Sequence, residues 1–316
     1  MAQVESNGKS LGEKLLSVPK SVLYLLLVLA TSVPLFAPFP VPNRTSAASN
    51  DFYRTLMTMP EGSTIMLQSD WTNGTRGESR GQFDEFMRIC MRRKLKVALC
   101  SVGDPQAPEV AKFTIEKLVA EHEKEFGVKY ERWNDWVYAG YFPGAEGTGQ
   151  AFAADFYNAI KEKRDKSPDG SDKPIVQSPV MQNIKKLGDF GAYAIITGTK
   201  SSRIMIERLG RKVTMLASVT GVMGPETLNY YVTGQLSGLV IGLKGSYDVE
   251  MLMEKGAELT DAKGNPVNIP AYSGKSNLGR ANLYVGPLHA AIGLMILAVV
   301  IGNVGVFLTR KKEANS

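Results

Sequence analysis

Two long segments without a charged side chain lie near opposite ends of this 316-residue chain, at positions 21–38 and 283–309. A helix needs about 20 apolar residues to cross roughly 30 Å of hydrocarbon. With its flanks, the first segment predicts a membrane helix over 19–38, which prolines interrupt and end. The competing interpretation is a cleaved signal peptide within 1–37, since a basic stretch precedes the apolar run. The length of the run and the prolines after it favour an uncleaved anchor.

The second segment predicts a membrane helix over 284–309, followed directly by three basic residues. Small residues spaced four apart let helices approach closely in lipid, and a polar side chain in a span favours a protein-facing position. The residues that would form such an interface are Gly286, Ala290, Ala298, Gly302 and Asn303. Its partner would be the first span, a second copy of the chain or another membrane protein. Ordinary membrane composition explains the small residues equally well.

The charges near both predicted spans indicate the orientation of the chain. Basic residues next to spans favour the cytoplasmic side, which places the tails 1–18 and 310–316 in the cytoplasm of a two-pass protein of the cell membrane. The part between them, an α/β domain over 39–256 and an extended stalk over 257–283, then lies outside the cytoplasm. The net charge of +6 comes partly from the tails. No block of Lys and Arg is interleaved with aromatics, so we expect no nucleic-acid binding.

Apolar runs alternate with helical patterns through the middle of the chain. Alternation of this kind is typical of a mostly parallel sheet covered by helices on both faces. We therefore expect a three-layer α/β fold, Rossmann-like or flavodoxin-like, with 163–174 as an exposed loop. The predicted strands are 63–69, 96–102, 136–142, 193–197, 212–218 and 238–242, and the predicted helices are 82–93, 108–126, 150–163, 202–209, 225–233 and 247–255.

Histidine and cysteine are scarce, with two of each. A zinc site needs about four ligands at characteristic spacing, and a serine–histidine triad needs a suitable histidine. His122 lies in a run of charged residues that predicts a solvated helix face. Cys90 and Cys100 are expected to be two separate buried thiols rather than a disulfide. The composition thus predicts no metal site, no cofactor and no catalytic residue.

Ligands in parallel α/β folds bind at the carboxyl ends of the strands. After the third predicted strand, a glycine-rich stretch leads into a helix, whose free N–H groups favour an anion. The candidate residues are Gly144, Gly147, Thr148 and Gly149. No Lys-Ser or Lys-Thr follows the last glycine, so the stretch is not a Walker sequence. A tight turn without a ligand is the competing interpretation.

Two aspartates follow the first two predicted strands, Asp70 and Asp104. Asp70 resembles the phosphotransfer aspartate of haloacid-dehalogenase-like enzymes, but Thr72 stands where that family has its second aspartate, which removes the general acid. The two aspartates could together flank a cation. Aspartates in such loops also serve as simple turn formers.

The layout of the chain resembles a family of prokaryotic membrane proteins of uncharacterised function, with an α/β domain between two terminal spans. Four short motifs carry the resemblance: Gly224-Pro-Glu226, Tyr230-Tyr231, Gly234-Gln-Leu236 and Gly242-Leu-Lys-Gly245. It implies no activity and transfers no catalytic residue. Three hypotheses follow for function. They are a non-enzymatic subunit or scaffold of a membrane assembly, a module that binds or senses a small anion, and a metal-assisted phosphohydrolase using Asp70 and Asp104.

Overall fold

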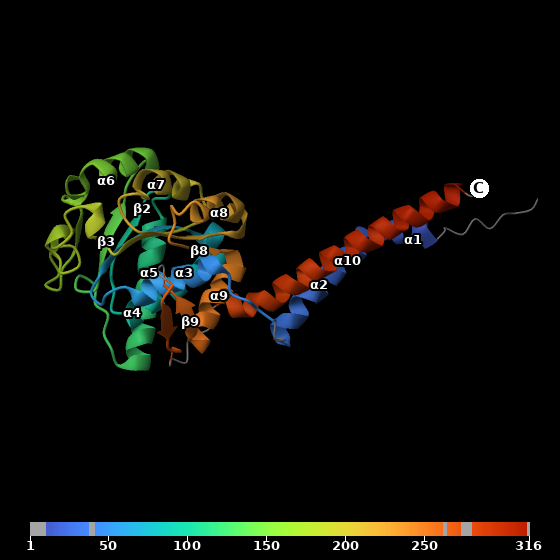
Figure 1. The fold of residues 1–316 in the computed structure, drawn as a ribbon, viewed down its shortest axis with the longest axis horizontal. Coiled ribbons are helices and arrows are strands. Elements are labelled where there is room, and N and C mark those ends of the chain that lie inside the picture. Colours follow the sequence, from blue (N-terminus) through green and yellow to red (C-terminus); the bar gives the residue numbers. More distant parts are fainter. Residues whose placement is uncertain (1–10, 38–41, 262–263, 273–279, 315–316) are drawn as a thin grey trace, which may run out of the picture. The chain divides into compact units, whose positions relative to one another are not determined.

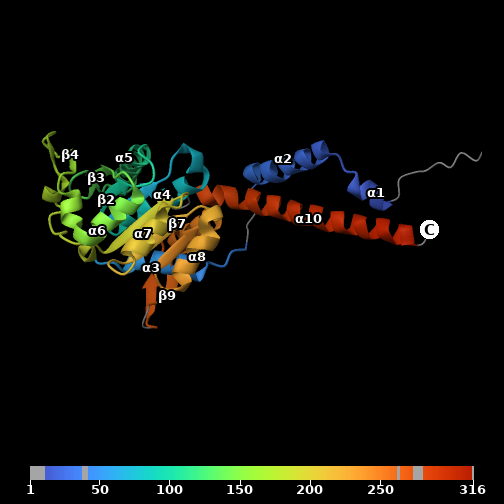
Figure 2. The ribbon, with the colours of Figure 1, turned by 90° about the horizontal axis from the view of Figure 1, so that it is seen from above.

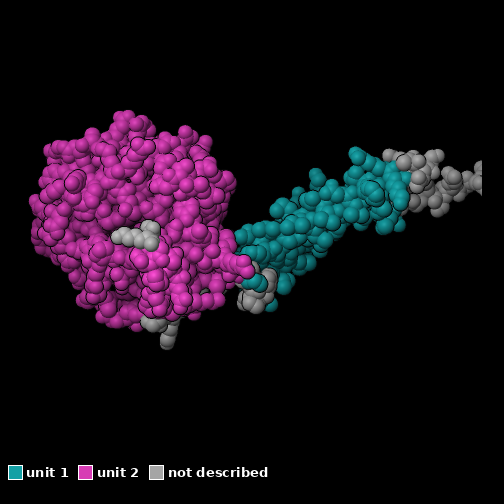
Figure 3. All heavy atoms as spheres, in the orientation of Figure 1, with its two compact units in different colours: residues 1–42, 283–316 teal, residues 43–282 magenta. Residues whose placement is uncertain are grey.

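A computed structural model of the chain describes residues 11–37, 42–261, 264–272 and 280–314. These residues form two compact units, coloured separately in Figure 3. One unit, Asn43–Asn282, is the α/β domain. The other combines the two ends of the chain, Met1–Pro42 and Leu283–Ser316.

The α/β unit is built on a six-stranded, fully parallel sheet with the order β3-β2-β1-β6-β7-β8. The chain starts in the middle at β1, adds β2 and β3 on one side, then crosses to β6 and adds β7 and β8 on the other. This is the Rossmann strand order, and its switch point lies between β1 and β6. The strands are β1 (Thr64–Asp70), β2 (Lys96–Ser101), β3 (Trp136–Tyr141), β6 (Ala192–Thr197), β7 (Met215–Val219) and β8 (Gly238–Ile241).

Helices cover both faces of the sheet, as the predicted three-layer fold requires (Figures 1 and 2). The central strands are buried on both sides, which is why they appear in the sequence as continuous apolar runs. One face carries α3 (Ala47–Thr58), α4 (Arg76–Arg92), α5 (Ala107–Phe126) and α9 (Gly242–Lys255). The other carries α6 (Ala145–Ile160), α7 (Ser201–Leu209) and α8 (Gly224–Val232). Among the described residues, four short 3₁₀ turns lie in the connections, at Asn73–Thr75, Ile175–Gln177, Leu187–Asp189 and Gly221–Met223.

Two segments fold differently from the sequence-based expectation. The expected exposed loop 163–174 pairs as a hairpin of β4 (Arg164–Lys166) and β5 (Asp172–Pro174), in which Asp165 is buried. The expected extended stalk begins as a second hairpin, β9 (Ala257–Thr260) with β10 (Pro266–Ile269), and Ile269 packs into the core. Residues 273–279 of that stalk lie outside the described residues.

The unit formed by the chain ends contains α1 (Leu11–Leu16), α2 (Lys20–Phe36) and most of α10 (Arg280–Ala314). Within α10, Leu283–Lys311 is the one described helix long and apolar enough to cross a membrane. The 17-residue helix α2 is mostly apolar and mostly exposed, but at 1.5 Å per residue it covers only about 26 Å. The structure therefore shows one candidate span, and a second span over 19–38 is not established.

The close helix contact in this unit lies at a position that the sequence analysis did not select. A Cβ atom added to Gly12 of α1 would stand 2.8 Å from the Gly305 carbonyl oxygen of α10. Of the predicted interface residues, Gly286 is buried and Ala290 half-buried, whereas Ala298 and Asn303 are exposed. An added Cβ at Gly302 would meet nothing within 4 Å. Within the described part of this unit, α1 packs against α10 at Gly305. It does not cover Ala298, Gly302 or Asn303.

Gly238 permits the closest helix–sheet contact in the α/β unit and gives a testable prediction. A Cβ atom at this position would lie 2.3 Å from the Phe52 Cα atom and 2.4 Å from the Phe52 nitrogen. Since main chain cannot rotate away, Gly238→Ala must push α3 off β8, at a cost of about 1–3 kcal/mol or more. Gly77→Ala is the control, because nothing lies within 4 Å of its added Cβ. We expect thermal unfolding to show a clearly lower Tm for Gly238→Ala only; equal values would contradict the contact.

Candidate functional site

Asp70 ends β1 at the switch point of the sheet, where ligands bind in this class of fold. Its side chain is buried. A carboxylate removed from water is costly unless hydrogen-bond donors replace its hydration. The donors around Asp70 therefore determine whether it is available for chemistry.

Five donors surround the Asp70 carboxylate. Oδ1 accepts from the Ser101 hydroxyl at 2.6 Å and from the main-chain N–H groups of Val102 and Gly103 at 2.9 and 3.0 Å. Oδ2 accepts from the Gln68 amide at 2.5 Å and the Ser201 hydroxyl at 2.6 Å. These donors come from β1, from β2 and the loop after it, and from the first turn of α7. The carboxylate thus links the ends of β1 and β2 to the first turn of α7, and its lone pairs are used internally.

Two glycines allow close packing of the loops beside Asp70. A Cβ on Gly103 would lie 3.0 Å from the Asp70 carboxyl carbon, so only glycine lets this loop reach the carboxylate. A Cβ on Gly198, after β6, would lie 2.7 Å from the Thr75 methyl and 3.1 Å from the Thr220 methyl. The loops after β1, β6 and β7 therefore press against one another where a Rossmann-type ligand would otherwise lie.

Asp104 has a separate structural role. Its Oδ1 accepts the Gln106 N–H at 2.7 Å just before α5 begins. The Ser101 hydroxyl, which donates to Asp70, lies 2.9 Å from the Asp104 main-chain oxygen. Asp70 and Asp104 are thus neighbours through Ser101, but each carboxylate has its own main-chain donors. This arrangement is that of turn formers and does not resemble an open cation site.

The glycine-rich stretch after β3 begins α6. Gly144 has a φ of +76°, which favours glycine, and Thr148 bonds back to the Pro143 carbonyl oxygen at 3.3 Å. A Cβ on Gly149 would lie 3.3 Å from both Arg208 and Met205 of α7, whereas nothing lies within 4 Å of one on Gly147. Glycine at 149 thus serves helix–helix packing. The stretch forms a tight turn at Gly144, a geometry that fits both interpretations of these residues.

A pair of buried acids was not found by the sequence analysis. Glu85 of α4 and Glu250 of α9 are 3% and 0% exposed, and Glu85 hydrogen-bonds Glu250. Burial, followed by repulsion from Glu250, raises the pKa of Glu85 well above its ordinary value, and Asp84 adds to this effect. The Glu250 Oε1 atom accepts the Ala281 N–H of α10 at 3.2 Å. Within the α/β unit, the acid pair therefore holds the first turn of α10.

The remaining candidate groups lie in the core. Cys90 and Cys100 are free and buried, as expected, and burial raises the pKa of both thiols. His122 is not on a solvated face: it is 8% exposed and its ring lies 4.9 Å from that of Phe126. Burial lowers the pKa of His122. The prediction was wrong because it rested on the charged residues next to His122 in the sequence, whereas His122 itself lies on the inward side of α5.

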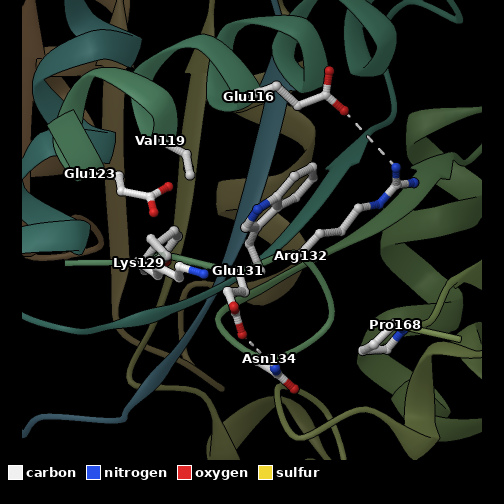
Figure 4. Close-up of a pocket in the computed structure, with 10 residues that line it drawn as sticks. Glu116, Val119, Glu123, Lys129, Glu131, Arg132, Asn134 and Pro168 are labelled. Carbon is white, nitrogen blue, oxygen red and sulfur yellow. Dashed lines mark hydrogen bonds and ion pairs between the residues drawn. The ribbon is translucent and has the colours of Figure 1, made fainter. Parts of the chain in front are cut away.

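A cavity of the α/β unit lies at the amino end of β3, away from the carboxyl ends of the strands (Figure 4). It measures about 480 Å³ and lies between the second half of α5, residues 129–136 and the β4–β5 hairpin. Its walls carry the carboxylates of Glu116, Glu123 and Glu131 and the indole of Trp136. Glu116 and Glu123 are seven residues apart on α5, about two helical turns, so they lie on the same face of the helix. This spacing is the signal in the sequence that could have indicated an acidic surface here.

Comparison with known proteins gives no match: no family model, no curated protein and no solved structure is similar to this chain. The resemblance in layout to prokaryotic membrane proteins therefore stays a prediction. Among the described residues, no group of three or more His, Cys, Asp or Glu side chains is arranged to hold a metal ion.

Replacing Asp70 tests its role at the switch point. In Asp70→Asn an amide N–H₂ would face donors that now point at a carboxylate oxygen, and hydrogen bonds to a charged group contribute about 1.5–3 kcal/mol each. We expect a loss of about 3 kcal/mol or more in the free energy of unfolding, measured by denaturant titration. Asp104→Asn, which keeps a carbonyl acceptor for Gln106, should change it little. Similar stabilities for the two variants would show that Asp70 does not organise these strands.

The buried acid pair predicts a pH dependence. Folded Glu85 keeps its proton at pH values where the unfolded side chain, with a pKa of about 4.3, has lost it. The native state then binds more protons, so stability falls as pH rises above about 4.3, by up to about 1.4 kcal/mol per pH unit, until the raised pKa is reached. Glu85→Gln, a neutral near-isostere, should flatten this slope between pH 5 and 8. Exposed Glu162→Gln should leave it unchanged, and parallel curves for all three proteins would contradict the assignment.

Proposed function

We propose that this chain is a non-enzymatic, membrane-anchored subunit whose α/β domain serves as a scaffold or binding partner in a larger membrane assembly. The observation that carries the proposal is the Asp70 cluster. In a Rossmann-like fold the switch point is the usual place for a ligand, and here an internal carboxylate takes the donors that a ligand anion would use. A site closed in this way supports a structural use of the fold.

The other two hypotheses lose their candidate groups to internal contacts. A phosphohydrolase would need Asp70 accessible to a metal and a phosphoryl group, yet the side chain is 3% exposed and accepts five hydrogen bonds. An anion sensor at the glycine-rich turn would need room beside Gly149, where the α7 side chains Met205 and Arg208 already lie. No specific observation in the described residues favours the phosphohydrolase or the anion sensor.

The helices of the chain ends support the membrane part of the proposal. Leu283–Lys311 is long and apolar, and its side chains are largely exposed. An exposed apolar helix of this length is stable in lipid and unfavourable in water. In this proposal α2 is the second pass, the tails 1–18 and 310–316 face the cytoplasm, and the α/β domain lies outside it. The uncovered residues Ala298, Gly302 and Asn303 are then available to another subunit.

The proposal predicts a stoichiometric assembly. Full-length tagged protein, extracted from its native membranes with a mild detergent, should give a native mass above that of one chain, with a fixed set of co-purifying proteins. Ala298→Leu with Gly302→Leu should weaken that assembly, since bulky side chains block close helix approach. Leu297→Ile, which keeps the size of an exposed lipid-facing side chain, is the control. A lone monomer from gentle extraction would argue against an assembly.

A ligand screen tests the absence of a small-molecule site at the switch point. A ligand that binds only the folded state at 100 times its Kd adds about 2.7 kcal/mol of stability. We expect inorganic phosphate, nucleotides and small carboxylates to leave the Tm unchanged. A saturable rise in Tm that Gly149→Ala or Asp70→Asn abolishes would favour one of the ligand-binding hypotheses instead.

A further inference from the structure

The cavity at the amino end of β3 has an excess of unneutralised negative charge. The Glu123 carboxylate forms no hydrogen bond or ion pair with the described residues, and the Glu131 carboxylate accepts only the Asn134 amide, at 3.0 Å. Glu116 stands 4.0 Å from the Arg132 guanidinium. Lys129 is the other basic residue of the cavity wall. Three carboxylates thus face one lysine and one arginine across about 480 Å³.

Arg132 offsets only part of this charge, because its guanidinium reaches Glu116 at 4.0 Å and is also paired with a buried aspartate. Arg132 donates from Nε to both oxygens of Asp165 at 3.1 and 3.3 Å, and its Nη2 also pairs with that carboxylate. Asp165 is buried and accepts the edge N–H of Tyr138 at 2.8 Å. Arg132 and Asp165 therefore neutralise each other, and the exposed wall keeps the charge of its glutamates.

Trp136 supplies a second, independent feature. The residue is only 2% exposed, and it lines the cavity. The indole N–H of Trp136 donates to no described residue. Unlike the unpaired indole N–H of Trp71, which is completely enclosed, it keeps some contact with solvent. Within the described part of the chain, the Nε1 atom of Trp136 is therefore unpaired and not fully enclosed, on a residue that lines the cavity. A buried indole N–H normally finds an acceptor.

The main chain holds these groups in place. Glu131 and Asp135 bond reciprocally, Asp135 N–H to the Glu131 carbonyl oxygen and Glu131 N–H to the Asp135 carboxylate, both at 2.8 Å. Trp133, between them, has a φ of +77°, a conformation that a bulky residue rarely adopts. The turn is thus fixed before any partner arrives, and binding there would order little additional chain.

We propose that this cavity binds a basic segment of a partner polypeptide, with a Lys or Arg side chain between Glu123 and Glu131 and a main-chain carbonyl accepting from the Trp136 N–H. This rests on the proposed function, to which it adds the chemistry of the partner. A peptide provides both requirements of the site, a cation for the carboxylates and an acceptor for the indole. A free polyamine provides the cation but has no acceptor.

The experiment uses the full-length chain in detergent and a fluorescent peptide, acetyl-Gly-Arg-Gly-Arg-Gly-amide, read by anisotropy. Its control has citrulline, a neutral isostere, at both Arg positions. We expect saturable binding of the Arg peptide that weakens with added salt. Glu123→Gln and Glu131→Gln should each weaken it about two- to five-fold, as for exposed ion pairs. Trp136→Phe should also weaken it, whereas exposed Glu162→Gln should not.

The outcomes separate the possible occupants. Equal binding of the citrulline peptide, or unchanged binding by the Glu123→Gln/Glu131→Gln double variant, would overturn the proposal. Spermidine that competes with the peptide and binds Trp136→Phe as tightly as the wild type would assign the site to a free polyamine instead. If the double variant still co-purifies with its assembly at full stoichiometry, the cavity assignment fails and the proposed function stands. A wild-type chain that forms no assembly refutes the proposed function whatever the peptide does.

Discussion

The α/β unit depends on one buried charge. Asp70 brings a full negative charge to the junction of β1, β2 and β6, and this is tolerable only because five donors from three segments surround it. The loop after β2 reaches the carboxylate only because Gly103 has no side chain. The same donors, two main-chain N–H groups and the first turn of α7, are those that a Rossmann-like fold offers to a bound anion. Satisfying them with an internal residue strengthens the junction and removes it as a ligand site.

The sheet could be predicted from the sequence because its signal is local. Strands buried on both faces appear as short apolar runs, and all six were placed within three residues of their ends. The start of α4 was missed by six residues, since Gly77, Ser79 and Gly81 are poor helix formers. There the tertiary structure decides: Ser79 and Gly81 are buried, and Glu78 accepts the Gly221 N–H at 2.7 Å. The 163–174 hairpin was missed for a related reason, because turn residues indicate where a chain reverses but not whether its arms pair.

The role of Asp70 could be predicted only in part. Its place at the end of β1 follows from the apolar run before it, but Ser101 and Ser201 lie 31 and 131 residues away along the chain. Only the folded strand order brings those hydroxyls to it. The buried acids Glu85 and Glu250 show the same limit, because a carboxylate in a helix is expected at the surface. Nothing local shows that Glu250 points inward to meet the first turn of α10.

The carboxyl ends of the strands and the amino end of β3 therefore differ in the binding surface that they present to other molecules. At the carboxyl ends of the strands, loops pack closely at Gly198, and the buried Asp70 carboxylate is fully hydrogen-bonded within the protein. At the amino end of β3, Asp165 covers the sheet edge by accepting the Tyr138 N–H, and its pairing with Arg132 leaves only Glu116 of the nearby glutamates in contact with an arginine, at 4.0 Å. A contact that stabilises the edge strand thus also creates an acidic cavity. Protection of a sheet edge is a general requirement, and here the same residues determine the charge of the surface that a partner would meet.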